Sequence, residues 1–214
     1  MSGRIFSSVG KKEIVAATGI LWLVFLAAHL LGNLTIYFGA KYFNSYAEHL
    51  HGLGIILWAM EAGLLVTILL HAFTALWLFI ENFFARPIRY AAGRKNQAGW
   101  VSKLMPYTGL YLFVFIVIHV VNFRLQRGTA TDSLLAGDLF SSPAWVAYYA
   151  VSMIVVGLHV THGLWSGAHT LGLGMTGRRN YETVRTASAA YSWVVGIGFG
   201  LLPIIILAIP SLLR

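Results

Sequence analysis

The sequence contains no cysteine among its 214 residues. Iron–sulfur clusters held by thiolates, haem attached through cysteine and disulfide bonds within the chain are therefore excluded. Any metal cofactor bound by this chain has to be held non-covalently, by histidine nitrogen or methionine sulfur.

Charged residues are also scarce. They make up 10% of the chain, whereas 58% of the residues are hydrophobic and the mean hydropathy is +0.74. A soluble domain of this length would need more charged surface, so the composition predicts an integral membrane protein. The few charges are mostly positive, with 15 Lys and Arg residues against 7 Asp and Glu.

Five apolar runs are long enough to cross a hydrocarbon core ~30 Å thick. They cover residues 14–37, 53–84, 104–124, 143–171 and 188–211, with boundaries good to a few residues. The sequence between them shows no linker or second domain. We therefore predict an all-α fold, a single membrane domain over residues 1–214 built as a bundle of five transmembrane helices.

The basic residues are sorted between the two sides of this bundle. Most of them precede the first run or lie between runs two and three or four and five, which places them on one side: Arg4, Lys11, Lys12, Arg86, Arg89, Arg94, Lys95, Lys103, Arg178, Arg179 and Arg185. The other side has Lys41, Arg124, Arg127 and Arg214. The positive-inside rule then predicts a cytoplasmic N-terminus and an external C-terminus. Because the charges sit in short loops between spans, we expect contact with membrane lipid and no binding of nucleic acid.

Four histidines each lie near the middle of a different apolar run. At ~1.5 Å of rise per residue, His29 and His119 come to lie outward of the membrane centre, and His71 and His159 inward of it. We call the first pair the outer layer and the second pair the inner layer. A lone membrane histidine is usually a hydrogen-bonding or channel-lining group, but four on separate helices in two matched layers favour two bis-histidine haem b centres.

Other histidines compete for these roles. His162 lies one turn inward of His159 on the same helix face and is an alternative ligand. His169 continues towards the inner surface, where it would contact a haem propionate. His49 and His51 stand at the outer mouth of the second run, too close to water to be first-choice ligands.

A single acidic residue lies well inside a span. Glu61 stands ten residues outward of His71, which brings it close to the outer layer. An intramembrane carboxylate is a functional candidate, here for proton exchange with a quinone or with a haem propionate, although a carboxyl hydrogen-bonded to a neighbouring helix explains it equally well. Glu48, His49 and His51 form a second proton-exchange candidate, for which a solvated loop is the alternative.

Several strings, taken in order, resemble one family. They are A-H-L-L-G-N at 28–33, F-N-S-Y-A-E-H at 43–49, L-H-A-F at 70–73, I-H-V-V-N at 118–122, S-S-P-A at 141–144 and G-L-H-V-T-H-G-L-W-S at 157–166. Together they resemble the two-haem, five-helix cytochrome b membrane-anchor subunit of succinate dehydrogenase and fumarate reductase, the succinate:quinone oxidoreductases. Each string is weak alone, and their order and spacing make the match specific.

The resemblance implies a set of roles. His71 and His159 would ligate the proximal haem and His29 and His119 the distal haem, the pairing that the depths also give. Flavoprotein and iron–sulfur subunits on the cytoplasmic side of the cell inner membrane would carry the succinate or fumarate chemistry. This chain would then pass electrons between the iron–sulfur subunit and a quinone.

Two haems stacked across the membrane suit a low-potential quinone, and we expect menaquinone, bound on the outer side near Glu61. Two alternatives remain open at the level of sequence. One is the cytochrome b anchor of another respiratory enzyme, of the hydrogenase or formate dehydrogenase type. The other is a haem-free transporter that uses the histidines to move protons.

Overall fold

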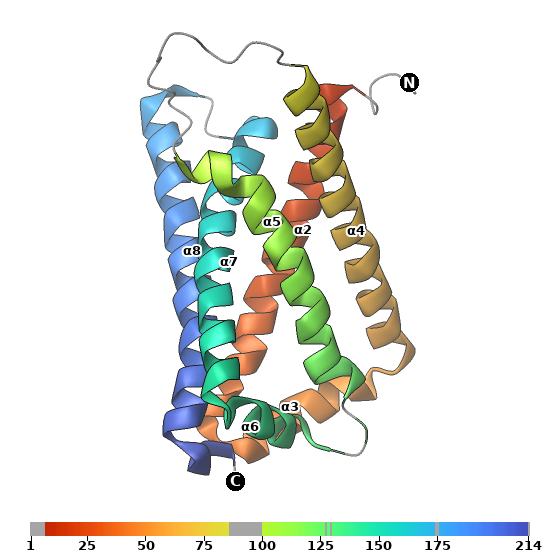
Figure 1. Cartoon of the computed structure of the whole chain (residues 1–214), viewed down its shortest axis with the longest axis vertical. Coiled ribbons are helices and arrows are strands. Elements are labelled where there is room, and N and C mark those ends of the chain that lie inside the picture. Colours follow the sequence, from red (N-terminus) through yellow and green to blue (C-terminus); the bar gives the residue numbers. More distant parts are fainter. Residues whose placement is uncertain (1–6, 86–99, 127, 129, 174–175, 214) are drawn as a thin grey trace.

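The computed structural model describes residues 7–85, 100–126, 128, 130–173 and 176–213 (Figure 1). In chain order its elements are α2 (Ser8–Leu34), η1 (Thr35–Phe38), α3 (Ala40–Gly52), α4 (Ile55–Phe84), α5 (Trp100–Val120), the π-helical η2 (Val121–Leu125), α6 (Asp132–Phe140), α7 (Pro143–Thr170), α8 (Gly177–Ala208) and η3 (Pro210–Leu213). The predicted all-α bundle of five membrane helices is confirmed, because α2, α4, α5, α7 and α8 are each long and apolar enough to cross a membrane.

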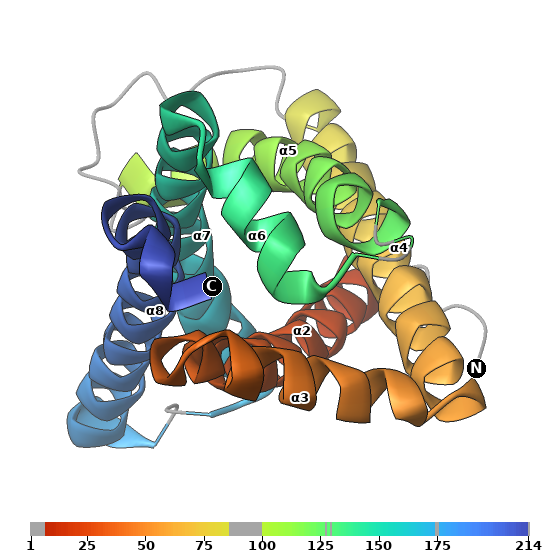
Figure 2. The same cartoon turned by 90° about the horizontal axis from the view of Figure 1, so that it is seen from below.

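The five long helices run side by side, and two short helices lie across one end of them (Figures 1 and 2). We call the end covered by α3 and α6 the capped end. The opposite end, which we call the basic end, carries these described cations: Lys11, Lys12, Lys103, Arg178, Arg179 and Arg185. Of the other cations used to predict the orientation, Arg4, Arg86, Arg89, Arg94, Lys95, Arg127 and Arg214 lie outside the described residues.

Helices α7 and α8 form the most extensive helix–helix contact among the described residues. Small residues recur at every fourth position along α8, namely Ser188, Ser192, Gly196 and Gly200. A Cβ added at Gly196 would lie 3.4 Å from the carbonyl oxygen of Met153 and 3.6 Å from the Cα of Gly157. The two backbones therefore approach closely, which is how membrane helices associate in the absence of a hydrophobic driving force.

The capped end is closed by a reciprocal pair of hydrogen bonds. The Nδ2 of Asn44 in α3 donates to the hydroxyl of Ser133 in α6 over 2.9 Å, and the Ser133 backbone N–H donates to Asn44 Oδ1 over 3.0 Å. Ile36, Phe140 and Leu213 are buried beneath the two helices. Helix α6 lies in the polar segment between the third and fourth predicted spans, and α3 was not predicted.

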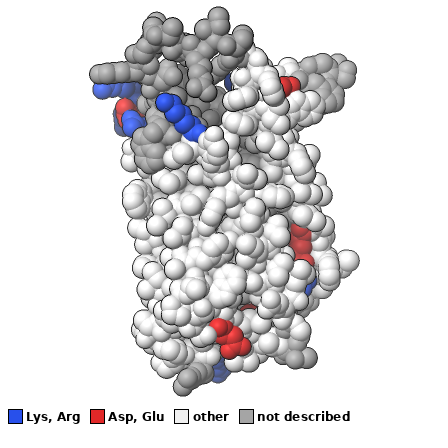
Figure 3. Space-filling view, viewed as in Figure 1, with Lys and Arg blue, Asp and Glu red and all other residues white. Residues whose placement is uncertain are grey.

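Charge is confined to the two ends of the bundle and a few places along its sides. Figure 3 shows a broad, mostly uncharged band between two ends that both carry charged side chains, with most of the visible Lys and Arg at the end drawn at the top. Large apolar side chains cover this band, among them Trp58, Phe73, Leu110 and Ile154, each more than half exposed. An exposed surface of this kind fits lipid contact.

Candidate functional site

The structure brings the two outer-layer histidines together near the capped end. The ring centroids of His29 on α2 and His119 on α5 lie 5.9 Å apart, with the rings at 85° to each other. Each ring stacks on a phenylalanine four residues earlier in its own helix, Phe25 at 5.2 Å and Phe115 at 5.8 Å. The α-helical repeat places residues i and i+4 on one face, so each histidine shares a helix face with its phenylalanine.

Further aromatic rings enclose this pair. Phe199 of α8 lies 5.4 Å from His29, and Phe123 and Tyr149 lie 5.1 Å and 6.1 Å from His119. Such a shell excludes water. The Nδ1 of His119 is buried and has no hydrogen-bond partner among the described residues.

The inner-layer histidines have different surroundings. The Nδ1 of His71 on α4 lies 3.1 Å from both the hydroxyl of Thr18 and the carbonyl oxygen of Val15, both on α2. The Nδ1 of His159 on α7 lies 3.1 Å from the hydroxyl of Thr108 on α5.

The two layers lie at different depths. Thr18 marks the level of His71 on α2, eleven residues before His29, and Thr108 marks the level of His159 on α5, eleven residues before His119. Eleven residues of helix rise ~16 Å. The outer layer lies at that distance from the inner layer, towards the capped end.

The donor set fits haem better than a metal held by protein groups alone. Among the described residues no group of three or more His, Cys, Asp or Glu side chains could hold a metal ion, and the histidines come in pairs. Haem iron takes its four other ligands from the macrocycle and needs two protein groups. The imidazoles of His29 and His119, with centroids 5.9 Å apart, lie close enough together for one such group to be held by both.

His162 and His169 belong to a separate cluster on α7. Their rings pack on either side of Trp165, at 5.8 Å and 5.0 Å, and His169 also contacts Tyr181 of α8 at 5.3 Å. His159 contacts Thr108 instead. His162 therefore has different neighbours from His159, and both the choice of ligand on α7 and a propionate contact by His169 stay predictions.

Glu61 is paired with an arginine. Its carboxylate accepts hydrogen bonds from Nε of Arg124 over 2.7 Å and from a terminal guanidinium nitrogen over 3.1 Å. The guanidinium also lies 5.1 Å from the ring centroid of Trp58. Arg124 belongs to the π-helical turn η2, and such turns often mark functional sites. Of the two interpretations of Glu61, a carboxyl bonded to a neighbouring helix describes its contacts here.

A second, unpredicted ion pair lies at the other end of α4. The ammonium of Lys11 on α2 lies 2.5 Å from both carboxylate oxygens of Glu81 and 4.7 Å from the ring centroid of Trp77, whose indole donates to Glu81. Lys11 is only 5% exposed, so its charge depends on this partner. The contact ties α2 to α4 at the basic end.

The second proton-exchange candidate lies on α3 at the capped end. Glu48 and His49 are exposed, and His51 is half-buried with its Nε2 3.8 Å from a carboxylate oxygen of Asp132 on α6. This pair adds an electrostatic contact between the two capping helices.

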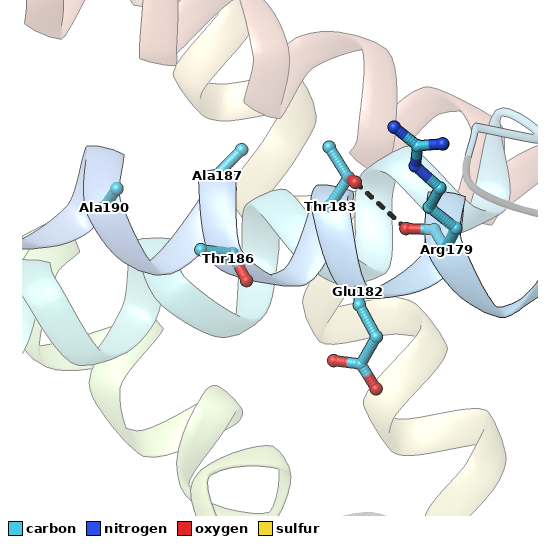
Figure 4. A pocket seen from close by; sticks show the side chains of 6 residues that line it. All are labelled: Arg179, Glu182, Thr183, Thr186, Ala187 and Ala190. Carbon is cyan, nitrogen blue, oxygen red and sulfur yellow. Dashed lines mark hydrogen bonds between the residues drawn. The ribbon is translucent and has the colours of Figure 1, made fainter.

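A shallow depression with a volume of about 520 Å³ lies on α8 near the basic end (Figure 4). It is lined by Arg179, Glu182, Thr183, Thr186, Ala187 and Ala190. All six are exposed, and the Thr183 hydroxyl is already bonded to the carbonyl of Arg179. No histidine lines this depression.

The threonines that contact the inner layer were missed at the level of sequence. Each begins a Thr-Gly pair eleven residues before an outer-layer histidine, Thr18-Gly19 before His29 and Thr108-Gly109 before His119. The recurrence of Thr-Gly at the same spacing before two histidines was the sequence signal that could have identified these threonines. A single threonine in an apolar helix is easily taken for a residue that bonds only to its own helix.

Comparison with known proteins gives one relative. The chain is 28% identical over 165 residues to the succinate dehydrogenase cytochrome b558 subunit of Bacillus subtilis (strain 168), a match that covers 72% of this chain and 75% of the relative. No protein-family model and no solved structure matches. The resemblance predicted from the motifs is thus confirmed: over most of its length, this multi-pass membrane protein is similar to a succinate dehydrogenase cytochrome b subunit.

Proposed function

We propose that this chain is the membrane-anchor subunit of a succinate:quinone oxidoreductase, carries two haem b groups and transfers electrons between an iron–sulfur subunit and a quinone. The observation that carries the proposal is the placement of four intramembrane histidines in two layers, with His29 against His119 and with His71 and His159 each in contact with a threonine of a neighbouring helix. The relative named as a cytochrome b subunit of succinate dehydrogenase supports it.

The two histidine pairs are the proposed haem ligands. His71 and His159 would hold the inner haem, and His29 and His119 would hold the outer haem. When bound, haem iron supplies one-electron redox chemistry at a potential set by its ligands and surroundings. His162 is retained as the alternative ligand on α7, with Thr108 favouring His159.

The residues around the ligands have separate tasks. Phe25, Phe115 and Phe199 pack on the outer-layer imidazoles, where they exclude water and restrict rotation of the rings. Thr18 and Thr108 contact the inner-layer imidazoles through Nδ1, which leaves Nε2 of each ring available to iron. A metal-bound histidine usually has such a partner on its other nitrogen.

We place the partners at the basic end. That end would face the cytoplasm under the positive-inside rule and is nearer the inner layer, so electrons would enter or leave through His71 and His159. Flavoprotein and iron–sulfur subunits would dock there and carry the dicarboxylate chemistry, since this chain has no cysteine to hold a cluster. The complex would reside in the cytoplasmic membrane of a bacterium.

The quinone site is proposed near the outer layer, with menaquinone as the substrate. Electrons that cross the membrane from inner to outer layer move charge along the membrane potential, which contributes ~2.3 kcal/mol per charge per 100 mV. Such a contribution would help to reduce a quinone whose reduction by succinate has an unfavourable free energy. Glu61 would exchange protons with the quinone after separating from Arg124, with Glu48, His49 and His51 between it and the external water.

Purification of the assembled complex from its native host is the test. We expect two b-type haems per copy of this chain, together with a flavoprotein and an iron–sulfur subunit that oxidise succinate. Recovery with hydrogenase or formate dehydrogenase subunits would assign the chain to another respiratory enzyme. Recovery without haem would favour the proton-coupled transporter.

A further inference from the structure

Helices α2 and α5 share a twelve-residue repeat. Residues 18–29 read TGILWLVFLAAH and residues 108–119 read TGLYLFVFIVIH. Each repeat starts with Thr-Gly, carries Val-Phe at its seventh and eighth positions and ends with an outer-layer histidine. Each also lies on the first of two membrane helices that follow each other in the chain, α2 before α4 and α5 before α7.

The threonine of each repeat contacts the inner-layer histidine of the following membrane helix. The hydroxyl oxygens of Thr18 and Thr108 lie 2.7 Å and 3.0 Å from the carbonyl oxygens of the residues four earlier in their own helices. A hydroxyl has a single proton. When it is donated to that carbonyl, the oxygen can accept a hydrogen bond from Nδ1–H of the imidazole 3.1 Å away, in both repeats. At His71 the Val15 carbonyl, 3.1 Å from Nδ1, can only accept and so requires the proton on Nδ1.

This direction of the hydrogen bond fixes the imidazole tautomer. An imidazole that donates from Nδ1 carries its lone pair on Nε2, the atom that would bind iron. The hydrogen bond also makes the ligand more basic.

The glycine of each repeat leaves room for the same imidazole. A Cβ added at Gly19 would lie 3.2 Å from Cε1 of His71, and one added at Gly109 would lie 3.4 Å from Cε1 of His159. Each ring therefore lies against the backbone of the neighbouring helix. The Thr-Gly pair thus sets both the tautomer and the position of the ring.

The outer layer has no equivalent arrangement in the described part of the chain. The Nδ1 of His29 lies 3.4 Å from the amide nitrogen of Asn33 in its own helix, and Nδ1 of His119 is buried without a partner. The two layers therefore differ in the groups that orient their ligands.

We propose that Thr18 and Thr108 are positioning residues of the inner haem, a matched pair that holds His71 and His159 with Nε2 towards the iron while leaving the outer haem unaffected. The inference rests on the proposed function, because it assigns these residues to a haem that the function requires. It adds a difference between the two haems that the histidines themselves do not predict.

The effects of the two threonines should be unequal. His71 has a second acceptor, the carbonyl oxygen of Val15, at 3.1 Å. Among the described residues, no second partner accompanies Thr108 at His159. Loss of the Thr108 hydroxyl should therefore have the larger effect.

The experiment uses the whole purified complex with Thr18→Val, Thr108→Val and the corresponding Thr→Ser variants. Thr161→Val is the matched control, because Thr161 also lies on a membrane helix and bonds to its own helix at Gly157. The readouts are the electron paramagnetic resonance signals of the two ferric haems, their midpoint potentials and the haem retained per chain. The signal that disappears in His71→Ala identifies the inner haem.

We expect Thr108→Val to shift the inner-haem signal, to raise the inner-haem potential and to weaken inner-haem retention by about 10–100-fold, the usual effect of losing such a partner. Thr18→Val should do the same to a smaller degree. Both serine variants should restore the wild-type values, and the outer haem and Thr161→Val should show no change.

Two results would overturn the inference while leaving the proposed function intact. One is a wild-type complex with two haems whose inner-haem signal and potential are unchanged by both valine substitutions. The other is an equal loss of both haems in these variants and in Thr161→Val, which would show a general packing role. A wild-type complex without haem would instead overturn the proposed function, and with it this inference, before any variant is made.

Discussion

In the outer layer, His29 and His119 contact each other inside a shell of aromatic rings, whereas in the inner layer His71 and His159 each contact a threonine of a neighbouring helix. The same residue type is thus held by packing in one layer and by hydrogen bonds in the other. Packing excludes water and restricts ring motion, but a hydrogen bond also selects which nitrogen carries the proton. Four equivalent residues in the sequence become two inequivalent sites in the fold.

Replacement of the ligands is the most direct way to break this comparison. His71→Ala or His159→Ala should remove the inner haem and interrupt transfer from the iron–sulfur partner, because each iron would lose one of two protein ligands. His29→Ala or His119→Ala should remove the outer haem alone. Haem content and difference spectra of the purified complex measure both effects.

His162→Ala is the control for this prediction, since His162 packs on Trp165 whereas His159 contacts Thr108. If His162→Ala abolished a haem that His159→Ala leaves in place, the assignment of the ligand on α7 would be wrong.

A second prediction concerns the close approach of helix backbone to the inner layer. Gly19→Val should displace the imidazole of His71, because the added Cβ would lie 3.2 Å from Cε1, and should weaken inner-haem binding by about 10-fold, the low end for loss of ligand orientation. Haem retained per chain after dilution in detergent is the measurement. Gly63→Val is the matched control on α4, since no heavy atom lies within 4 Å of a Cβ built there. An equal loss of haem in both variants would contradict the prediction.

The sequence predicted the membrane helices well, for a clear reason. Each span is a run of about twenty apolar residues, which is a local property of the chain. Depth along a span is also local, so counting residues from the span ends was enough to group His29 with His119 and His71 with His159.

Contacts between helices could not be predicted in the same way. The pairing of Arg124 with Glu61 depends on how α4 and α5 are rotated and on the π-helical turn of η2, neither of which a residue count gives. The contact between Lys11 and Glu81 could not be predicted for the same reason, since the two residues are seventy residues apart in the chain. Helix α3 was missed because its short amphipathic segment at the membrane surface has little hydropathy signal.

A third prediction separates the two interpretations of Glu61 at the outer layer. If Glu61 exchanges protons with the quinone, Glu61→Gln should slow quinone turnover by about 10²-fold, the low end for a proton-transferring group, while both haem spectra stay normal. Steady-state succinate:quinone reductase activity is measured beside the haem spectra.

Arg124→Gln is the matched control variant, because it removes the same ion pair but keeps the carboxylate of Glu61. It should retain turnover if the carboxylate acts on protons. Equal effects of the two variants on quinone turnover, or unchanged turnover in Glu61→Gln, would contradict a role in proton exchange. The Glu61–Arg124 ion pair would then only connect α4 to α5.

The smallest expected effect is a difference in potential between the two haems. Exposed cations gather at the basic end, nearer the inner layer, whereas the carboxylate of Glu61 near the outer layer is neutralised by Arg124. Positive charge nearby favours the reduced iron, and one unscreened charge ~10 Å away contributes roughly 1–2 kcal/mol at an effective dielectric constant of ~20. The inner haem should therefore titrate at the higher potential, by some tens of millivolts.

Because exposed charges are screened by salt, the difference in potential between the two haems should narrow as ionic strength rises. A redox titration of the purified complex at low and high salt tests both points; two indistinguishable haems, or an outer haem with the higher potential, would contradict this origin of the difference.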